Sequence, residues 1–219
     1  MRNIVKYAYN VLDNIRDITD DALARDIIDE VIIEEHNGNG FWASVHYEPV
    51  TPETVKTTHK ILVPKEFVMD DKSEFVLDYI KKKYNLKLKN CEMNYVIFAL
   101  LHELGHHVND ITKLRNEGYN AFNEYHDNGC VLKDELNDKC TEKVNAIRSA
   151  YETTIDIIEK TITHPLEKRI MMKQAKDCMD SETNKAYEQA YYDYRQVPEE
   201  YEADRLSALY ISQLIKARA

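Results

Sequence analysis

The sequence has no long apolar run and no excess of basic residues. No apolar stretch approaches the roughly 20 residues that a bilayer-spanning helix needs, and the first ten residues, MRNIVKYAYN, lack the apolar core of a signal peptide. The 29 Lys and Arg against 39 Asp and Glu give a net charge of −10, which argues against a general nucleic-acid binder or a protein drawn to anionic membranes. We therefore expect a cytoplasmic protein with neither a nucleic-acid nor a membrane partner.

The sequence also lacks any CxxC pair. Its four cysteines are spread along the chain, at Cys91, Cys130, Cys140 and Cys178. This spacing is typical of reduced thiols in a cytoplasmic protein. A disulfide between Cys130 and Cys140 stays open as an alternative.

The most informative motif is HELGH at residues 102–106, an HExxH sequence. Residues four apart on an α-helix project from nearly the same face, so His102 and His106 are placed to bind one Zn²⁺. Glu103 lies between them and can reach a water on the metal rather than the metal itself. The preceding residues, YVIFALL, are almost wholly apolar, which predicts a buried helix that begins near Asn90. Two histidines and a glutamate would be costly in such a helix for structure alone.

The spacing of apolar residues predicts an α+β chain that is predominantly helical, with one domain or one domain and an elaborate insertion. The N-terminal half is expected to contain a helix over 3–35, strands over 41–47 and 55–63, a helix over 73–84 and the HExxH helix over 91–109. Farther along, apolar residues step by three or four from Leu136 to Ile162, as in an amphipathic helix. A break at 163–165 leads into a second long helix, so the two should form an antiparallel hairpin. A last helix is expected over 199–216.

Residues 31–35, VIIEE, fit two structures. They can extend the first helix up to the HNGNG segment at residues 36–40, which is the interpretation we favour. They can also form a strand that turns at HNGNG into the strand FWASVHY, giving a β-hairpin.

A catalytic zinc site needs a third protein ligand and an open position for water. The extended motif HExxHxxGxxH is excluded, because the chain has Asn109 and Thr112 where that motif has Gly and His. An aspartate shortly after the second histidine would be Asp110. A third pattern has a glutamate on a separate helix and, four residues later, an aspartate that orients a ligating histidine. This pattern occurs twice, as Glu152/Asp156 and Glu200/Asp204.

The surrounding sequence favours the second pair. Glu152 lies in the middle of a hairpin arm, where a solvated acidic residue is ordinary. Glu200 lies in the first turn of the last helix, whose apolar residues can dock on the core and leave the acidic turn facing the metal. We therefore expect Glu200 as the third ligand, with Asp110, Glu199 and Glu202 as alternatives.

HELGHH followed by EYEADRLSALY resembles the gluzincin metallopeptidases, in which a glutamate on a downstream helix completes HExxH. The chain is more similar to the soluble ImmA/IrrE-like branch than to the membrane-embedded HtpX/Ste type. The resemblance implies His102, His106 and Glu200 as zinc ligands, Glu103 as general base and Asp204 as the partner that orients a ligating histidine. It covers only the HExxH helix and the last helix. The chain departs from it in the 93 residues between His106 and Glu200 and in having no recognisable DNA-binding module.

We therefore expect a small zincin-like core, with a short β-sheet packed on the HExxH helix, and a long inserted helical hairpin. Residues 1–109 would form the N-terminal part of the core and contain the HExxH helix. Residues 110–197 would form the hairpin insertion, and residues 198–219 the C-terminal helix that completes the core.

The expected function is hydrolysis of peptide bonds in a peptide or protein substrate, by a zinc-activated water and with narrow specificity. By resemblance, strand 55–63 would offer an edge to the extended peptide, and an oxyanion donor would come from His107, His126, His164 or one of the 15 tyrosines. The alternative is a non-hydrolytic regulatory or binding protein with a structural or vestigial metal site and a partner on the hairpin. Glu103 favours the enzyme, because a structural zinc does not need it.

Overall fold

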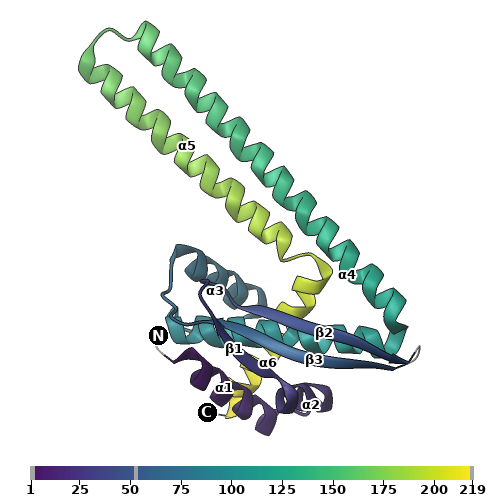
Figure 1. The fold of residues 1–219 in the computed structure, drawn as a ribbon. Coiled ribbons are helices and arrows are strands. Elements are labelled where there is room, and N and C mark those ends of the chain that lie inside the picture. Colours follow the sequence, from purple (N-terminus) through teal and green to yellow (C-terminus); the bar gives the residue numbers. More distant parts are fainter. Residues whose placement is uncertain (1–2, 52–53, 218–219) are drawn as a thin grey trace. The chain divides into compact units, whose positions relative to one another are not determined.

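The computed structural model describes residues 3–51 and 54–217. In chain order the described elements are α1 (Ile4–Ile18), α2 (Ala22–Glu30), β1 (Ile32–His36), β2 (Trp42–Thr51), β3 (Thr54–Pro64), α3 (Asp71–Tyr84), α4 (Glu92–Thr161), α5 (Pro165–Tyr194) and α6 (Pro198–Ala217). The predicted α+β, predominantly helical fold class is confirmed (Figure 1). In this part of the chain no helix is both long enough and apolar enough to cross a membrane.

The chain divides into two units. The first, which we call the core unit, comprises Met1–Asn123 and Glu199–Ala219, and the second, the hairpin unit, comprises Glu124–Pro198. The core unit contains the sheet, the first part of α4 and nearly all of α6. The hairpin unit consists of the remainder of α4 and the antiparallel helix α5 (Figure 1).

The sheet has the strand order β1-β3-β2, with β1 parallel and β2 antiparallel to the central strand. Side chains alternate between the faces of a strand, and in β3 the alternate residues His59, Ile61 and Val63 are buried. The buried face lies against α4, where the Tyr47 hydroxyl donates to the Asp110 carboxylate at 3.4 Å. The sheet therefore packs on the HExxH helix.

The N-terminal segment differs from the single helix predicted over 3–35. The helix is interrupted after Ile18, because Asp21 begins α2 by accepting a hydrogen bond from the Ala24 N–H at 3.1 Å. Residues 32–36 then form a strand, so extending the helix to residue 35 was wrong. The hairpin alternative was right about the strand and wrong about its partner, because β1 pairs with β3 rather than with β2.

The HExxH helix does not end near residue 109. It reaches Gly118, whose φ of 83° and ψ of 172° are not helical, and a second helical segment follows to Thr161, so α4 consists of two helices joined at a kink. The intervening residues carry few apolar side chains at helical spacing, so no amphipathic pattern revealed them, although pairs such as Lys113 and Glu117 support a solvated helix. The helix begins at Glu92, while Asn90 is hydrogen bonded to Lys81 of α3 instead of capping α4.

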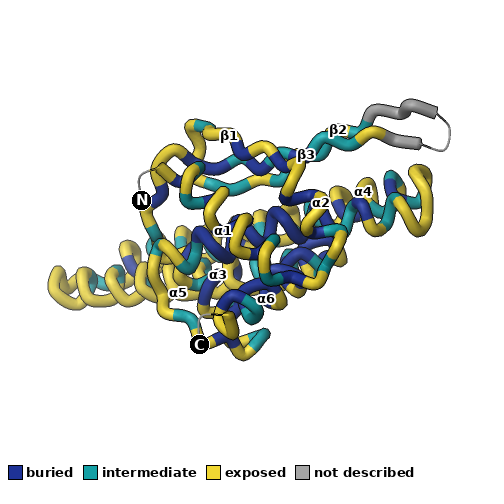
Figure 2. The backbone as a smooth tube through the Cα atoms, turned by 90° about the horizontal axis from the view of Figure 1, so that it is seen from below, coloured by how far each residue is buried: buried dark blue, intermediate teal, exposed yellow. Residues whose placement is uncertain are grey.

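The buried residues are concentrated in the core unit (Figure 2). The first turns of α4 pack with α6, where the Ser207 hydroxyl donates to the Phe98 carbonyl at 3.1 Å. Tyr210 of α6 is fully buried, and its hydroxyl donates to Asp21 at 3.0 Å. The last helix is thus fixed both to the HExxH helix and to the start of α2.

The four cysteines are free thiols. Cys130 and Cys140 lie ten residues apart on one helix, which separates them by about 15 Å along its axis. A disulfide needs Cα atoms within about 7 Å. The Cys130–Cys140 pair that the sequence left open is therefore not formed.

Candidate metal centre

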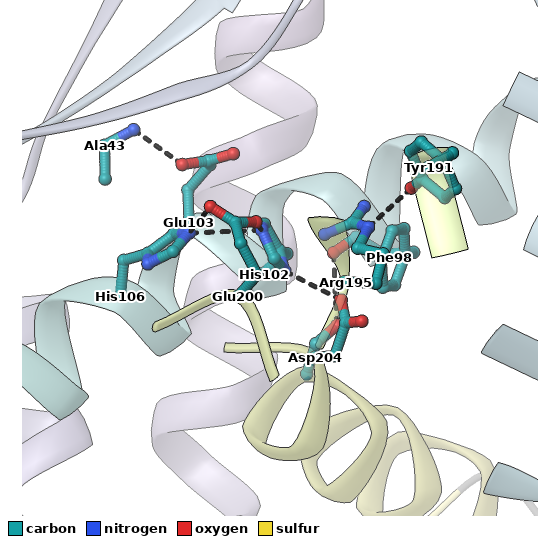
Figure 3. A network of polar contacts seen from close by, with 10 residues as sticks. Ala43, Phe98, His102, Glu103, His106, Tyr191, Arg195, Glu200 and Asp204 are labelled. Carbon is teal, nitrogen blue, oxygen red and sulfur yellow. Dashed lines mark hydrogen bonds and ion pairs between the residues drawn. The ribbon is translucent and has the colours of Figure 1, made fainter. Parts of the chain in front are cut away.

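Two helices of the core unit bring His102, His106 and Glu200 together (Figure 3). The histidines lie one turn apart on α4, and their Nε2 atoms are 3.1 Å from each other. Glu200, in the first turn of α6, places Oε2 3.2 Å from His102 Nε2 and Oε1 3.7 Å from His106 Nε2. The structure therefore places the third predicted ligand beside the two histidines, although 93 residues separate it from His106.

These distances fit a tetrahedral metal ion. With metal–ligand bonds of about 2.0–2.2 Å, two ligand atoms of a tetrahedron lie about 3.3–3.6 Å apart. The three separations between these ligand atoms, 3.1, 3.2 and 3.7 Å, scatter around that value. Two imidazole nitrogens and one carboxylate also form the donor set that catalytic zinc sites use. The residues present thus suit a divalent ion such as Zn²⁺.

Asp204 contacts Nδ1 of His102, the ring nitrogen that does not face Glu200 and His106. Its Oδ1 lies 3.0 Å from His102 Nδ1, and its side chain is fully buried. A carboxylate at Nδ1 holds the proton on that nitrogen and leaves the Nε2 lone pair directed at Glu200 and His106. The geometry therefore matches the orienting role that the resemblance implies for Asp204.

Glu103 is buried but is not part of the three-residue cluster. Its Oε2 accepts a hydrogen bond of 2.6 Å from the backbone N–H of Ala43 in β2. The sheet thus fixes the carboxylate of this residue beside the two histidines (Figure 3). The contact spans 60 residues of sequence and was not predicted.

Gly105 allows α4 and α6 to approach closely. A Cβ atom at this position would lie 2.8 Å from the Ala203 carbonyl oxygen and 2.9 Å from the Ala203 Cα. Both are backbone atoms, so a larger residue would push the helices apart rather than displace a side chain. Because Ala203 lies between Glu200 and Asp204, this contact sets how near both carboxylates come to the histidines.

The centre is acidic and mostly enclosed. The buried carboxylates here are those of Glu103, Glu199, Glu200 and Asp204. Several buried carboxylates favour a cation, since unpaired buried charge is costly. The His106 side chain keeps 16% of its surface exposed, against 5% for Glu200. An opening at His106 would supply the free position that a catalytic ion requires.

The alternative third ligands lie elsewhere. Asp110 accepts the hydrogen bond from Tyr47, and Glu202 forms an ion pair of 2.7 Å with Arg205. Glu199 is buried, but it is not among the residues that converge with the histidines. Glu152 is exposed on the hairpin unit.

The three histidines proposed as oxyanion donors do not belong to the three-residue cluster. His107 is completely buried and faces β3, with Nε2 3.0 Å from the Lys60 carbonyl and Nδ1 3.2 Å from His59 Nδ1. Burial, with the neighbouring His59, lowers the pKa of His107 to about 3 and keeps its ring neutral. It is therefore a packing residue beneath the sheet rather than a surface one. His126 and His164 are exposed residues of the hairpin unit.

Sequence reasoning missed two contributions to this centre. Ala43 could not be found, because its contact uses a backbone N–H and depends on strand pairing. Gly105 carried a signal, since a glycine inside a helix costs about 1 kcal/mol relative to alanine and often marks close packing.

Comparison with known proteins gave no matching family model, no matching curated protein and no matching solved structure.

Proposed function

We propose that the protein is a zinc-dependent metallopeptidase that acts in the cytoplasm on a protein substrate, with narrow specificity. The observation that carries this proposal is the convergence of His102, His106 and Glu200, with the carboxylate of Glu103 fixed beside them. A purely structural site would gain nothing from that extra glutamate. The gluzincin resemblance of HELGHH and EYEADRLSALY supports the same proposal.

In this function His102, His106 and Glu200 would hold Zn²⁺. The ion, when bound, lowers the pKa of a coordinated water towards 7 and polarises the carbonyl of the scissile bond. Asp204 keeps a proton on Nδ1 of His102, so that Nε2 remains the ligand atom. The acidic first turn of α6 presents Glu200 at a helix N-terminus, where the dipole stabilises its negative charge.

Glu103 would transfer a proton from the attacking water to the leaving amine. Its Oε2 is held by the Ala43 N–H, so we assign the proton transfer to Oε1. Oε1 accepts a proton from the attacking water and returns it to the nitrogen of the leaving amine. The hydrogen bond to Ala43 stabilises the ionised carboxylate and fixes its orientation, which keeps it ready as a base.

The substrate would align along β2. Strand 55–63 was expected to offer the edge, but β3 is the central strand and residues 60–62 are paired on both sides. The N–H of Ala43 points away from β3 towards Glu103, and backbone groups alternate along a strand. The N–H and C=O groups of Val45 and Tyr47 therefore share the outer edge of β2. An extended peptide bound there would lie beside Glu103.

The first experiment is zinc content per chain by elemental analysis, in wild type, Glu200→Ala and Asp110→Ala. We expect about one zinc in wild type and in Asp110→Ala, and clearly less in Glu200→Ala. Equal zinc content in wild type and Glu200→Ala would show that the third ligand is a residue other than Glu200. A wild type that holds no zinc, even when zinc is supplied, would exclude the peptidase.

The second experiment separates chemistry from metal binding. Glu103→Gln keeps the shape of the side chain and the bond to Ala43 but cannot accept the proton. We expect zinc content to stay at the wild-type value, while cleavage of a proteome-derived peptide mixture, read by mass spectrometry, falls at least 10²-fold. Cleavage that survives in Glu103→Gln would show that this residue is not the base.

The exposed apolar residues of the hairpin unit favour a second candidate, a binding or regulatory protein whose metal site is structural or vestigial. Its large exposed side chains include Ile157, Leu166 and Ile170. This function predicts that neither wild type nor Glu103→Gln cleaves any peptide, whether zinc is bound, as at a structural site, or absent, as at a vestigial one. The same assay therefore decides between the two functions.

A further inference from the structure

The HELGHH motif contains two interleaved pairs of residues four apart. The first pair, His102 and His106, belongs to the candidate metal centre. The second pair, Glu103 and His107, is turned about 100° round the helix, and both of its side chains contact the sheet. Only Glu103 of this second pair has a place in the proposed reaction. His107 is therefore the charged or polar residue of the motif that the function leaves unexplained.

Two side-chain contacts join His107 to β3. Its Nε2 lies 3.0 Å from the Lys60 carbonyl oxygen, and its Nδ1 lies 3.2 Å from Nδ1 of His59. The two imidazole rings are perpendicular, with their centroids 4.9 Å apart. His59 is 3% exposed and His107 is 0% exposed, so water does not compete for these nitrogens.

The contacts determine which ring nitrogens carry protons. A carbonyl oxygen can only accept, so His107 Nε2 must donate to Lys60. Burial lowers the pKa of both histidines, so both rings are neutral and Nδ1 of His107 carries no proton. His59 Nδ1 must therefore donate to His107 Nδ1. The hydrogen bonds thus run in one direction, from His59 through His107 to the Lys60 carbonyl.

This series of hydrogen bonds ends beside the strand position that holds Glu103. Lys60 lies opposite Ser44 in the register of β2 and β3, and Ser44 directly follows Ala43. The Ala43 N–H donates to Glu103 Oε2 at 2.6 Å (Figure 3). One turn of α4 is therefore joined to two adjacent strands, to β2 through Glu103 and to β3 through His107.

Directional contacts of this kind define a position that apolar packing does not. Apolar burial has no preferred direction, so a sheet packed on α4 through apolar side chains alone could shift along the helix. A hydrogen bond requires both a short distance and a suitable angle. The perpendicular imidazoles therefore hold β3, and with it β2, at one place on α4.

We propose that His107, held by His59, is a positioning residue that fixes β3 and β2 on α4 and so keeps the Ala43 N–H on the carboxylate of Glu103. It acts through the sheet and not on the substrate. Its effect on cleavage rests on the proposed function, whereas its effect on the contact between Ala43 and Glu103 does not.

Selective ¹⁵N labelling of histidine tests the direction of the hydrogen bonds. Two-bond correlations between ring nitrogens and ring protons distinguish a protonated nitrogen from a bare one. We expect His107 as the Nε2–H tautomer and His59 as the Nδ1–H tautomer. The opposite tautomer at either residue would break the series of hydrogen bonds and overturn the proposal.

Selective ¹⁵N labelling of alanine tests the positioning itself. The Ala43 amide proton, assigned by its loss in Ala43→Gly, should lie downfield and exchange slowly with solvent, because it is bonded to a carboxylate. His107→Phe keeps a buried ring but removes both nitrogens. We expect it to move the Ala43 signal upfield and to accelerate exchange of this amide at least tenfold. The signal of Ala99, which is buried on α4, should stay in place and show that the helix is intact.

Matched variants separate the hydrogen bonds from the filling of space. His107→Gln supplies an N–H donor and a carbonyl acceptor, so it should restore most of the wild-type Ala43 signal. His46→Phe makes the same exchange of rings at an exposed residue of β2 and should leave the signal unchanged. If His107→Phe does not fold, His59→Phe, which removes the donor to Nδ1, provides the comparison. An Ala43 signal that does not respond to the loss of the imidazole, or that responds equally to Gln and Phe, would overturn the proposal.

Zinc content and cleavage then connect the position of the sheet with the proposed reaction. We expect zinc content in His107→Phe to equal that of wild type, because the three ligands come from α4 and α6. The kcat on one peptide from the cleaved mixture should fall by about 10²-fold, as expected when a reacting group is misplaced by about 1 Å, and KM should change less. His107→Gln should regain most of this kcat.

The two kinds of measurement fail separately. A wild type that cleaves no peptide would contradict the proposed function, while the Ala43 signal would still decide whether His107 positions the sheet. A displaced Ala43 signal with an unchanged kcat would show that the reaction does not depend on this contact, and would overturn the role of His107 in it.

Discussion

Gly105 shows how one missing side chain sets the geometry of the candidate centre. We expect Gly105→Ala to weaken zinc binding at least tenfold, because its Cβ would lie 2.8 Å from the Ala203 carbonyl oxygen and would move α6 away from the histidines. Overpacking of this kind costs about 1–3 kcal/mol of stability. Competition with a chromogenic chelator measures the affinity, and urea unfolding measures the stability.

Gly40→Ala is the control for this substitution. The nearest atoms to its Cβ would be those of the Trp42 ring, at 3.5 Å and beyond, an ordinary contact, so neither zinc affinity nor stability should change appreciably. An unchanged affinity in Gly105→Ala would mean that the two helices do not depend on this close approach.

Asp204 acts on the ion through His102. We expect Asp204→Asn to lower zinc affinity about 10–100-fold, because the amide keeps the shape of the side chain but removes the charge at Nδ1. Glu202→Gln, two residues away and paired with Arg205, should leave the affinity unchanged. Equal affinities in the two variants would leave Asp204 without an orienting role.

The candidate centre was predictable from sequence to the extent that local spacing determines it. The four-residue interval of HExxH places His102 and His106 on one face of any helix, and Glu200 followed by Asp204 repeats that interval on another. The contact of Glu103 with Ala43 was not predictable, because it depends on the position of β2, which no local pattern specifies.

Elements were predictable where apolar spacing or a breaker residue marked them. Pro165 opens α5 as expected, because proline suits the first turn of a helix. The solvated stretch of α4 between the motif and the hairpin had no such mark, since a helix exposed on most sides needs no apolar stripe. The pairing of β1 with β3 could not be predicted, because two strands can pair across any length of intervening chain and the sequence does not show which strands will do so.

Helix α3 depends on Asp70, which accepts hydrogen bonds from the Ser73 N–H at 2.8 Å and the Ser73 hydroxyl at 2.5 Å. We expect Asp70→Ala to lower the free energy of unfolding by about 1 kcal/mol at pH 7. The bonds to Ser73 hold the pKa of Asp70 below its usual value of 3.8. The stabilisation is therefore complete above that value and is lost as pH falls through the lower pKa of the folded state.

Urea unfolding between pH 7 and pH 3 measures the free energy of unfolding of wild type and Asp70→Ala. The difference between the two free energies should stay constant down to about pH 4 and become smaller below it. Asp71→Ala removes a neighbouring carboxylate without removing the cap and should cost less. If the difference in free energy of unfolding between wild type and Asp70→Ala increased on acidification, the ionised carboxylate would not be what stabilises α3.

On the scale of the whole molecule, the two units have different sources of stability. The core unit buries an extensive apolar interior, together with every residue of the candidate centre. The hairpin unit consists of two long helices with a narrow seam and a charged surface. Metal binding should therefore stabilise one unit and leave the other unaffected, since an ion stabilises only the structure that contains its ligands.

Hydrogen exchange read by mass spectrometry tests this separation. Zinc at about 100 times its dissociation constant adds about 2.7 kcal/mol to the stability of the folded state that binds it. We expect a chelator to raise exchange in residues 92–117 and 199–217 and to leave residues 125–194 unchanged. Glu200→Ala should exchange like the chelated wild type and give no further response. If the hairpin lost protection to the same extent as the core, the two units would unfold as one, and the metal would stabilise the entire chain.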